Sequence, residues 1–272
     1  MSLPDRTKTA IPVRFYRAVT VLLHLFAGVF EVAALFPLYG HSRRSRAVSR
    51  WSARLLGIVN VKTIVQGAPP AIANRAAVLV ANHVSWLDIH LIHSVWEVRF
   101  VAKSEVRLWP LIGWLSWRTG TLFIERGKNR HAARINQSIQ TAFQQGHAVG
   151  VFPEGTTTDG KELTRFHASL LQPAVDERAM VYPVALRYLD ESGNVNVNAS
   201  YVGDTTLAES MRMIFAEKTI RAELIFLPAI DATGKSRREL AAQAQSAIAA
   251  ALNLPITGKT PGKSAGPQAA PR

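Results

Sequence analysis

The spacing of hydrophobic positions changes near residue 60. Before it, residues 18–38 (AVTVLLHLFAGVFEVAALFPL) form an apolar run of about the 20 residues that a helix needs to cross a bilayer. His24, Glu31 and Pro37 interrupt this run, and arginines lie on both sides of it, so the charge asymmetry gives no clean orientation. A helix lying in one leaflet explains this pattern better than a full span.

The next segment, residues 41–59 (HSRRSRAVSRWSARLLGIV), places a cluster of arginines ahead of Trp51, Leu55 and Leu56. This order suits a basic amphipathic helix on an anionic surface. We therefore expect residues 1–60 to be a membrane-associating helical segment; the alternative is a buried helix followed by a solvated charged face. A removable signal peptide is not expected, because no small-residue cleavage site follows the run convincingly.

After Val61, short apolar runs alternate with longer amphipathic segments, which predicts an α/β fold with a central, mostly parallel or mixed sheet flanked by helices. We expect one catalytic domain over residues 61–255 and a flexible tail over 256–272, where apolar residues are few. The predicted strands are 63–66, 77–81, 99–102, 121–124, 148–152, 181–186, 195–201 and 223–226. The predicted helices are 85–96, 109–117, 130–145 and 237–252.

Composition narrows the choice of partners. The 272 residues are 48% hydrophobic, which argues for a packed domain, and 32 Lys and Arg against 19 Asp and Glu leave a formal charge of +13. This charge favours an anionic partner, which can be nucleic acid, lipid headgroups or a phosphorylated substrate. The absence of cysteine excludes disulfides, thiolate metal sites and a cysteine-bound acyl intermediate, and it fits a reducing compartment.

The candidate chemistry lies in residues 82–88, Asn-His-Val-Ser-Trp-Leu-Asp, where the predicted strand 77–81 gives way to a helix. His83 held by Asp88 can take a proton from a hydroxyl group. No G-x-S-x-G elbow lies on a predicted strand-to-helix turn to supply a serine nucleophile, so we expect the hydroxyl to belong to a substrate, and the pattern points to acyl transfer. Ligands of open α/β sheets also gather at such strand ends.

A structural role competes for Asp88. Ser85-x-x-Asp88 matches a capping box with Ser85 as the N-cap, although capping alone leaves His83 unexplained. The two roles can coexist, because one lone pair of the carboxylate can accept from the helix start and another from a His83 ring nitrogen.

Three further motifs follow in order: GTLFIERG at 120–127, FPEGT at 152–156 and VYPVAL at 181–186. With residues 82–88, they resemble the four blocks of the glycerolipid acyltransferase family, typified by 1-acylglycerol-3-phosphate acyltransferase. The resemblance covers roughly residues 82–186. It implies transfer of a fatty acyl group from an acyl carrier protein or coenzyme A thioester to the free hydroxyl of a lysolipid. It also implies that the protein works on an anionic membrane surface, at the cytoplasmic face of the inner membrane. No bound cofactor, metal or nucleic acid is expected.

Carried over residue by residue, the resemblance makes His83 the general base and Asp88 its orienting carboxylate. It assigns substrate binding to Arg126, Glu154, Gly155 and Thr156, to which Lys103 at the end of another strand adds positive charge. A guanidinium at Arg126 can clamp a phosphate with two hydrogen bonds, and Gly155 allows close approach of the backbone. Taken singly, these residues have ordinary explanations that fit equally well. Arg126 can be an exposed arginine in an ion pair, Glu154 and Gly155 can form a strand-ending turn, and Lys103 can be a surface lysine.

The chain departs from the family at Thr157, where the family usually carries arginine after F-P-E-G-T. The expected acceptor is 1-acylglycerol-3-phosphate, and the loss of this cation makes lyso-ornithine lipid the serious alternative. Arg126, Lys103 and Arg165 can compensate for the missing charge.

Three hypotheses from other classes remain. His83, Asp88, His90 and His93 can be regarded as metal ligands of a hydrolase, although their spacing matches no metallohydrolase pattern. Ser85 can be a serine-esterase nucleophile. A non-enzymatic basic membrane-surface or nucleic-acid-binding protein also fits the charge of +13 and the tryptophans. These tryptophans are Trp86, Trp96, Trp109, Trp114 and Trp117.

Overall fold

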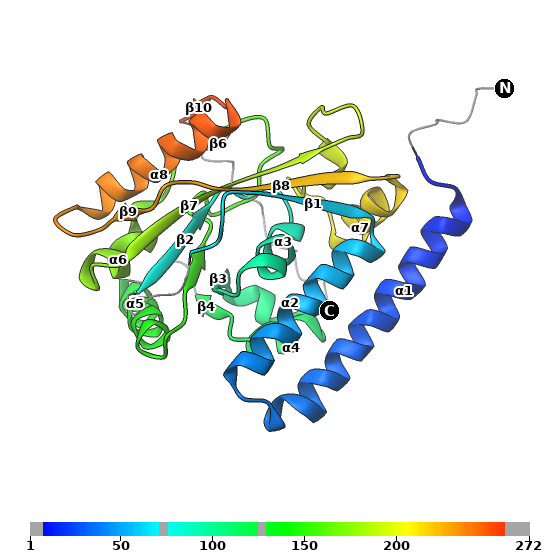
Figure 1. Ribbon diagram of the computed structural model, residues 1–272, viewed down its shortest axis with the longest axis horizontal. Coiled ribbons are helices and arrows are strands. Elements are labelled where there is room, and N and C mark those ends of the chain that lie inside the picture. Colours follow the sequence, from blue (N-terminus) through cyan, green and yellow to red (C-terminus); the bar gives the residue numbers. More distant parts are fainter. Residues whose placement is uncertain (1–7, 71–75, 125–128, 259–272) are drawn as a thin grey trace, which may run out of the picture.

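The structure is a computed structural model that describes residues 8–70, 76–124 and 129–258 (Figure 1). A mixed sheet runs through the centre in the order β1-β8-β7-β2-β5-β3-β4, and β9 pairs with β7. Neighbouring strands are parallel except where β7 meets β8 and β9. The predicted mostly parallel or mixed sheet is confirmed. The strands are β1 (Val61–Gln66), β2 (Ala77–Ala81), β3 (Arg99–Lys103), β4 (Leu122–Ile124), β5 (Val149–Val151), β6 (Leu163–Thr164), β7 (Met180–Leu189), β8 (Ile220–Phe226), β9 (Ile230–Asp231) and β10 (Ile256–Thr257).

Helices cover both faces of the sheet, which explains why the sequence of β2 is a continuous apolar run. Leu79 and Ala81 point into a core shared with α2, α3 and α7, while Val78 and Val80 point into a second core shared with α5 and α8. The helices are α1 (Ile11–Phe30), α2 (His41–Ile58), α3 (Leu87–Val95), α4 (Ile112–Arg118), α5 (Asn129–Gln144), α6 (Gln172–Asp176), α7 (Leu207–Ala216) and α8 (Arg237–Leu252). Short helical turns cover Glu31–Leu35, Phe36–Leu38, Ser104–Leu108, Ala168–Leu171 and Val197–Ala199.

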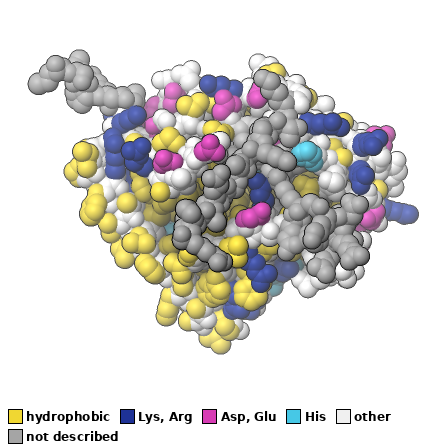
Figure 2. Space-filling view, turned by 180° about the vertical axis from the view of Figure 1, so that it is seen from behind, with side chains coloured by type: hydrophobic (Ala, Val, Ile, Leu, Met, Phe, Trp, Pro, Cys, Tyr) yellow, Lys and Arg dark blue, Asp and Glu magenta, His cyan; other side chains and the backbone are white. Residues whose placement is uncertain are grey.

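The apolar N-terminal run forms one helical segment, Ile11–Leu38, that is long and apolar enough to cross a membrane. Arg17 fastens it to the domain, because its guanidinium donates to the carbonyls of Phe215 (2.9 Å) and Glu217 (2.6 Å) at the end of α7. The opposite face of α1 is bare, and Figure 2 shows hydrophobic side chains gathered on that side of the molecule. The exposed apolar side chains of α1 are Ile11, Val13, Phe15, Tyr16, Val19, Leu22, Leu23, Phe26 and Phe30.

Helix α2 corrects part of the sequence-based interpretation. Its apolar side chains Leu55 and Leu56 are buried within the protein, and Ser49 donates to the Ser94 carbonyl in α3. The apolar face expected to rest on a membrane therefore packs against α3. The arginine-bearing face stays exposed, so of the helices α1 and α2 it is α1 that offers an apolar surface to a bilayer.

Two other expectations were wrong. Residues 195–201 form no strand: Val195 makes one bridge to Leu189, the Asn196 N–H donates to the Tyr188 carbonyl (2.9 Å), and a short helical turn then begins at Val197. The side-chain amides of Asn196 and Asn198 hold this turn by donating to the Glu217 carboxylate. The tail prediction also fails at its first residues, since β10 pairs with β6. Residues 259–272 lie outside the described part of the chain.

Candidate active site

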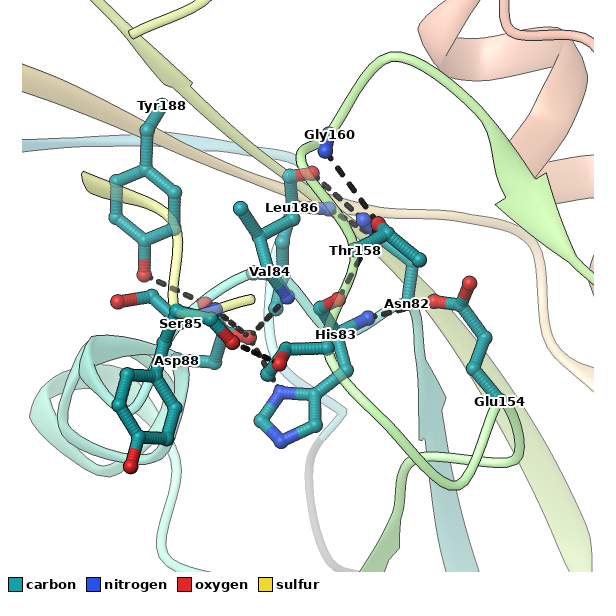
Figure 3. Close-up of polar contacts among 12 residues, drawn as sticks. Asn82, His83, Val84, Ser85, Asp88, Glu154, Thr158, Gly160, Leu186 and Tyr188 are labelled. Carbon is teal, nitrogen blue, oxygen red and sulfur yellow. Dashed lines mark hydrogen bonds and ion pairs between the residues drawn. The ribbon is translucent and has the colours of Figure 1, made fainter. Parts of the chain in front are cut away.

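The site begins where β2 ends, and Asn82 is the residue that ends it. Its side-chain amide donates to the Leu186 carbonyl (2.9 Å), and its side-chain oxygen accepts from the Leu186 amide (2.8 Å) (Figure 3). This pair of hydrogen bonds to β7 replaces the next step of the backbone ladder. The main chain is therefore free to leave the sheet at His83, at the carboxyl end of a central strand.

His83 and Asp88 lie in contact, as the sequence predicted. His83 Nδ1 is 2.7 Å from Asp88 Oδ2, and the Asp88 side chain is fully buried whereas that of His83 is 19% exposed. Because the carboxylate occupies Nδ1, the Nε2 atom is left to accept a proton from outside. The geometry is that of a general base oriented by a carboxylate.

The Asp88 carboxylate accepts four hydrogen bonds, which fix it completely. Its Oδ2 also accepts the backbone N–H groups of Val84 (2.8 Å) and Ser85 (3.0 Å) at the start of α3, and its Oδ1 accepts the Tyr188 hydroxyl (2.7 Å). Asp88 thus holds the His83 ring and also accepts from the Ser85 amide, but in the described part of the chain the reciprocal Ser85 hydroxyl bond of the expected capping box is absent. Burial, followed by the neighbouring Asp88 charge, raises the pKa of Tyr188 well above its ordinary value, so its hydroxyl stays protonated and donates.

Glu154 holds the backbone of the loop that carries His83. Its Oε1 accepts the His83 N–H (2.8 Å), and its Oε2 accepts both the N–H and the hydroxyl of Thr164 (2.9 Å each). The Thr158 amide donates to the His83 carbonyl (2.8 Å). His83 is therefore held at its N–H, its C=O and its ring. Burial raises the pKa of Glu154, and these hydrogen bonds oppose the rise.

An aromatic contact completes the support of the imidazole. The His83 ring stacks on Phe152, with 4.0 Å between ring centroids and 11° between planes, and Phe152 stacks in turn on Phe100 at 5.3 Å. The buried Phe152 fixes the ring plane without using either ring nitrogen. Sequence reasoning missed Phe152, Tyr188 and Thr164. Phe152 stands in the quoted F-P-E-G-T motif, but Tyr188 and Thr164 are polar residues in otherwise ordinary strands.

The residues predicted to bind substrate lie in different environments. Glu154 is 2% exposed, and three protein donors occupy its carboxylate. Gly155 takes a positive φ of 70°, which favours glycine, and its amide donates to the Phe152 carbonyl instead of being reserved for a ligand. Thr156 is half-buried beside it, and Lys103 is half-buried at the end of β3. Arg126 lies outside the described residues.

Thr157 turns its side chain towards the protein: its hydroxyl donates to the Tyr201 carbonyl. Arg165, which was expected to compensate for the missing cation, is exposed in the segment after β6. The described part of this loop thus presents a neutral side chain where the resembling family has arginine.

The two alternative chemistries receive little support. Ser85 is fully buried and its Oγ has no hydrogen-bond partner among the described residues, so no general base activates it as a nucleophile. Helix α3 begins at Leu87 with Trp86 as its N-cap, so Ser85 is not the predicted cap either. His90 lies 3.4 Å from the Ser52 hydroxyl and His93 bonds to the Val98 carbonyl (2.9 Å). Both rings are thus held by protein partners away from the His83–Asp88 pair.

Comparisons with known proteins find the following similarities. The Acyltransferase family model matches residues 60–187. The lyso-ornithine lipid O-acyltransferase of Pseudomonas aeruginosa is 37% identical over 209 residues, covering 77% of this chain and 79% of that protein. The 1-acyl-sn-glycerol-3-phosphate acyltransferase of Neisseria meningitidis is 35% identical, covering 72% and 76%. The crystal structure of the 1-acyl-sn-glycerophosphate (LPA) acyltransferase PlsC from Thermotoga maritima superposes with a TM-score of 0.68 at 20% identity, covering 89% of this chain and 94% of that one.

Proposed function

Since the chain belongs to the acyltransferase family, we propose that His83 and Asp88 carry out the transfer of a fatty acyl group from an acyl thioester to the hydroxyl of a lysolipid. The chain is a lysolipid O-acyltransferase, an enzyme that associates with membranes through its apolar N-terminal helix. The contact that carries the proposed mechanism is the 2.7 Å hydrogen bond between His83 Nδ1 and buried Asp88.

In the proposed reaction, His83 Nε2 takes the proton of the lysolipid hydroxyl as its oxygen attacks the thioester carbonyl. Asp88 stabilises the imidazolium that forms and holds the ring in the Nδ1–H tautomer. Collapse of the tetrahedral intermediate breaks the C–S bond, and the thiolate leaves with the proton that His83 returns. Base catalysis of this kind contributes about 10²- to 10⁴-fold, and positioning of the two substrates supplies much of the rest.

Glu154 has a different proposed role from the one expected. Its carboxylate accepts three hydrogen bonds from the protein and is almost completely buried, so it acts as a positioning residue that fixes the His83 backbone. Acceptor recognition then falls to the other residues of the predicted set: Lys103 and Thr156, which are half-buried, and Arg126, which lies outside the described residues.

The proposed acceptor is lyso-ornithine lipid, and 1-acylglycerol-3-phosphate is the second candidate. The hydroxyl of Thr157 is directed at the Tyr201 carbonyl, so position 157 offers no cation to a phosphate. An ornithine headgroup carries amino and carboxylate groups and needs no phosphate clamp. The relatives from Pseudomonas aeruginosa and Neisseria meningitidis are named for these two acceptors at 37% and 35% identity, so the comparisons leave both open.

The experiment supplies the purified chain with a labelled acyl thioester and each lysolipid in turn, and identifies the product by mass. We expect lyso-ornithine lipid to be consumed at the higher kcat/KM. The variant Thr157→Arg should raise the ratio of lysophosphatidate to lyso-ornithine turnover by about tenfold or more, because one charge-assisted contact contributes roughly 1.5–3 kcal/mol. Thr157→Gln is the uncharged control. Equal ratios in both variants would refute the role of position 157.

The donor and the location complete the proposal. The thiol carrier is an acyl carrier protein or coenzyme A, and no further cofactor is required. The enzyme works at the cytoplasmic face of the inner membrane, where the charge of +13 attracts an anionic lipid surface.

A further inference from the structure

A second site lies at the end of the sheet opposite His83. A cavity of about 420 Å³ opens beside the amino ends of β3 and β5, between the start of α2 and the end of α4. Since β3 is five residues long and a strand rises about 3.3 Å per residue, roughly 13–17 Å of sheet separates the cavity from the catalytic end. We call it the basic cavity; its lining includes Tyr39, His41, Arg44, Glu97, Arg99, Arg118 and His147.

The charges around the basic cavity do not balance. Arg44, Arg99 and Arg118 face Glu97 as the one carboxylate in the lining, and none of the three forms an ion pair with a described residue. Burial, followed by the neighbouring Arg99 charge, lowers the pKa of His147 to about 4, so this ring stays neutral at pH 7. This excess of positive charge favours the binding of an anion.

The start of α2 also favours the binding of an anion. The helix has no side-chain cap at Gly40 and no acidic residue in its first turn, which instead carries His41, Arg43 and Arg44. Cations at a helix N-terminus are unfavourable, because the first N–H groups and the helix dipole already present positive charge there. An anion in the basic cavity, which His41 and Arg44 line, would relieve both effects.

The guanidinium of Arg99 is held in place at the cavity wall. It donates to Gln145 Oε1 (3.0 Å) and contacts the His147 ring, and Gly120 leaves room for it. A Cβ at Gly120 would lie 3.1 Å from Arg99 Nε, and the φ of 96° there also favours glycine. Specific contacts with Gln145 and His147, and the space left at Gly120, thus hold Arg99 at the wall of the basic cavity.

Exposed apolar side chains border the basic cavity. Leu38, at the end of the apolar N-terminal segment, is 76% exposed and precedes Tyr39 in the lining, and Trp117 is 49% exposed beside Arg118. Figure 2 shows the hydrophobic surface extending from α1 around the lower end of the molecule. With this apolar surface in a bilayer, a basic site at its tryptophan-bearing margin would lie at the depth of the lipid headgroups.

We propose that the basic cavity binds the phosphate of an anionic membrane phospholipid, as an anchoring site separate from the catalytic centre. Two-pronged hydrogen bonding by guanidinium groups suits phosphate oxygens. His41, Glu97 and His147 do bring three ligand atoms within 4.8 Å of one another, as a metal site would. Three neighbouring guanidinium groups would repel a divalent cation, however, so the charge favours the anion.

The test measures binding without turnover, so its outcome is independent of the proposed reaction. The full chain, purified in an uncharged detergent, is titrated by calorimetry with dihexanoyl phosphatidylglycerol. Arg44→Gln/Arg118→Gln removes two cavity charges. Arg46→Gln/Arg107→Gln removes two exposed charges from the same regions, because Arg46 lies on α2 and Arg107 precedes α4, and neither lines the cavity. We expect saturable binding that weakens at least tenfold in the first variant and within about twofold in the second.

Equal losses in the two double variants would overturn the proposal, because binding would then reflect surface charge alone. Binding of inorganic phosphate that depends on the cavity, with no lipid binding, would identify free phosphate as the ligand instead. Zn²⁺ binding abolished by His147→Ala, without phosphate binding, would establish the metal site. If the double variant melts at a much lower temperature, Arg118→Gln against Arg107→Gln gives the same comparison with one charge removed.

Discussion

The charge of Asp88 is the feature whose removal tests the catalytic pair most sharply, and Asp88→Asn removes it with little change of shape. The amide oxygen can take the place of Oδ2 and keep the three N–H donors of His83, Val84 and Ser85. The amide nitrogen then faces the Tyr188 hydroxyl, which can turn to accept. The fold and the Nδ1–H tautomer should survive, so only the charge is lost.

The size of the effect follows from the contact distance. With Nδ1 and Oδ2 2.7 Å apart, the centres of charge of the imidazolium and carboxylate are about 4 Å apart, and two unit charges at that separation interact by about 4 kcal/mol at an effective dielectric constant of about 20. We therefore expect kcat to fall by roughly 10³-fold with KM unchanged, measured with saturating acyl thioester and lysolipid.

The control is Tyr188→Phe, which keeps the charge and removes one donor to Asp88, and we expect it to lower kcat by about tenfold or less. Thermal melting of both variants checks that they fold. Asp88→Asn with kcat within tenfold of the parent would refute the role assigned to the carboxylate charge.

Two further perturbations test the supports of the site. Glu154→Gln places an amide nitrogen against either the His83 N–H or the two Thr164 donors, so we expect a loss of about 1–3 kcal/mol in unfolding free energy and a fall in kcat, seen by denaturant melts and assays. An unchanged kcat would show that the backbone clamp is dispensable. Desolvation lowers the pKa of His90 from its ordinary 6.5 to about 3, so its stabilising effect is complete above pH 6.5 and is lost as the pH falls towards 3, by about 1.4 kcal/mol per pH unit. His90→Gln should flatten the pH dependence of unfolding across this window, and an unaltered slope would assign the acid sensitivity to other groups.

The sequence predicted the parts of the fold that local patterns determine. Helix α8 was expected at residues 237–252 and lies there. Ser236 and Glu239 form a capping box at its start, and an apolar stripe follows along the helix. The strand β2 was placed correctly, since a short, fully apolar run has few other uses. Helix α7 was missed, although Thr206 and Glu209 cap it in the same way.

Failures came where distant residues decide the local structure. Residues 195–201 alternate like a strand, but pairing with β7 stops after Asn196, and the side chains of Asn196 and Asn198 donate to the distant Glu217 across a helical turn. The apolar face of α2 was expected to rest on a membrane, and only the tertiary contacts of Leu55 and Leu56 show that it is buried.

The candidate site divides in the same way. His83 and Asp88 are five positions apart and were found together, because a short loop after a strand can bring them into contact. Tyr188 lies 100 residues beyond Asp88, and Thr164 lies 10 beyond Glu154. No periodicity or spacing links such pairs. The pairing of β7 with β2 brings Tyr188 to Asp88, and the path of the loop after β5 brings Thr164 of β6 to Glu154. The donors that occupy Glu154 were likewise invisible, so its substrate-binding role was inferred from the motif alone.

The central claim is that the His83 imidazole deprotonates an alcohol supplied by the lysolipid, and single-turnover transfer tests it most directly. Full-length parent and His83→Gln are mixed with labelled acyl thioester and lysolipid, and product lipid and labelled protein are quantified over time. We predict a fall in the transfer rate of about 10²- to 10⁴-fold in the variant and no acyl label on the parent protein. Transfer at the parental rate by His83→Gln, or label attached to Ser85 before product forms, would contradict the account.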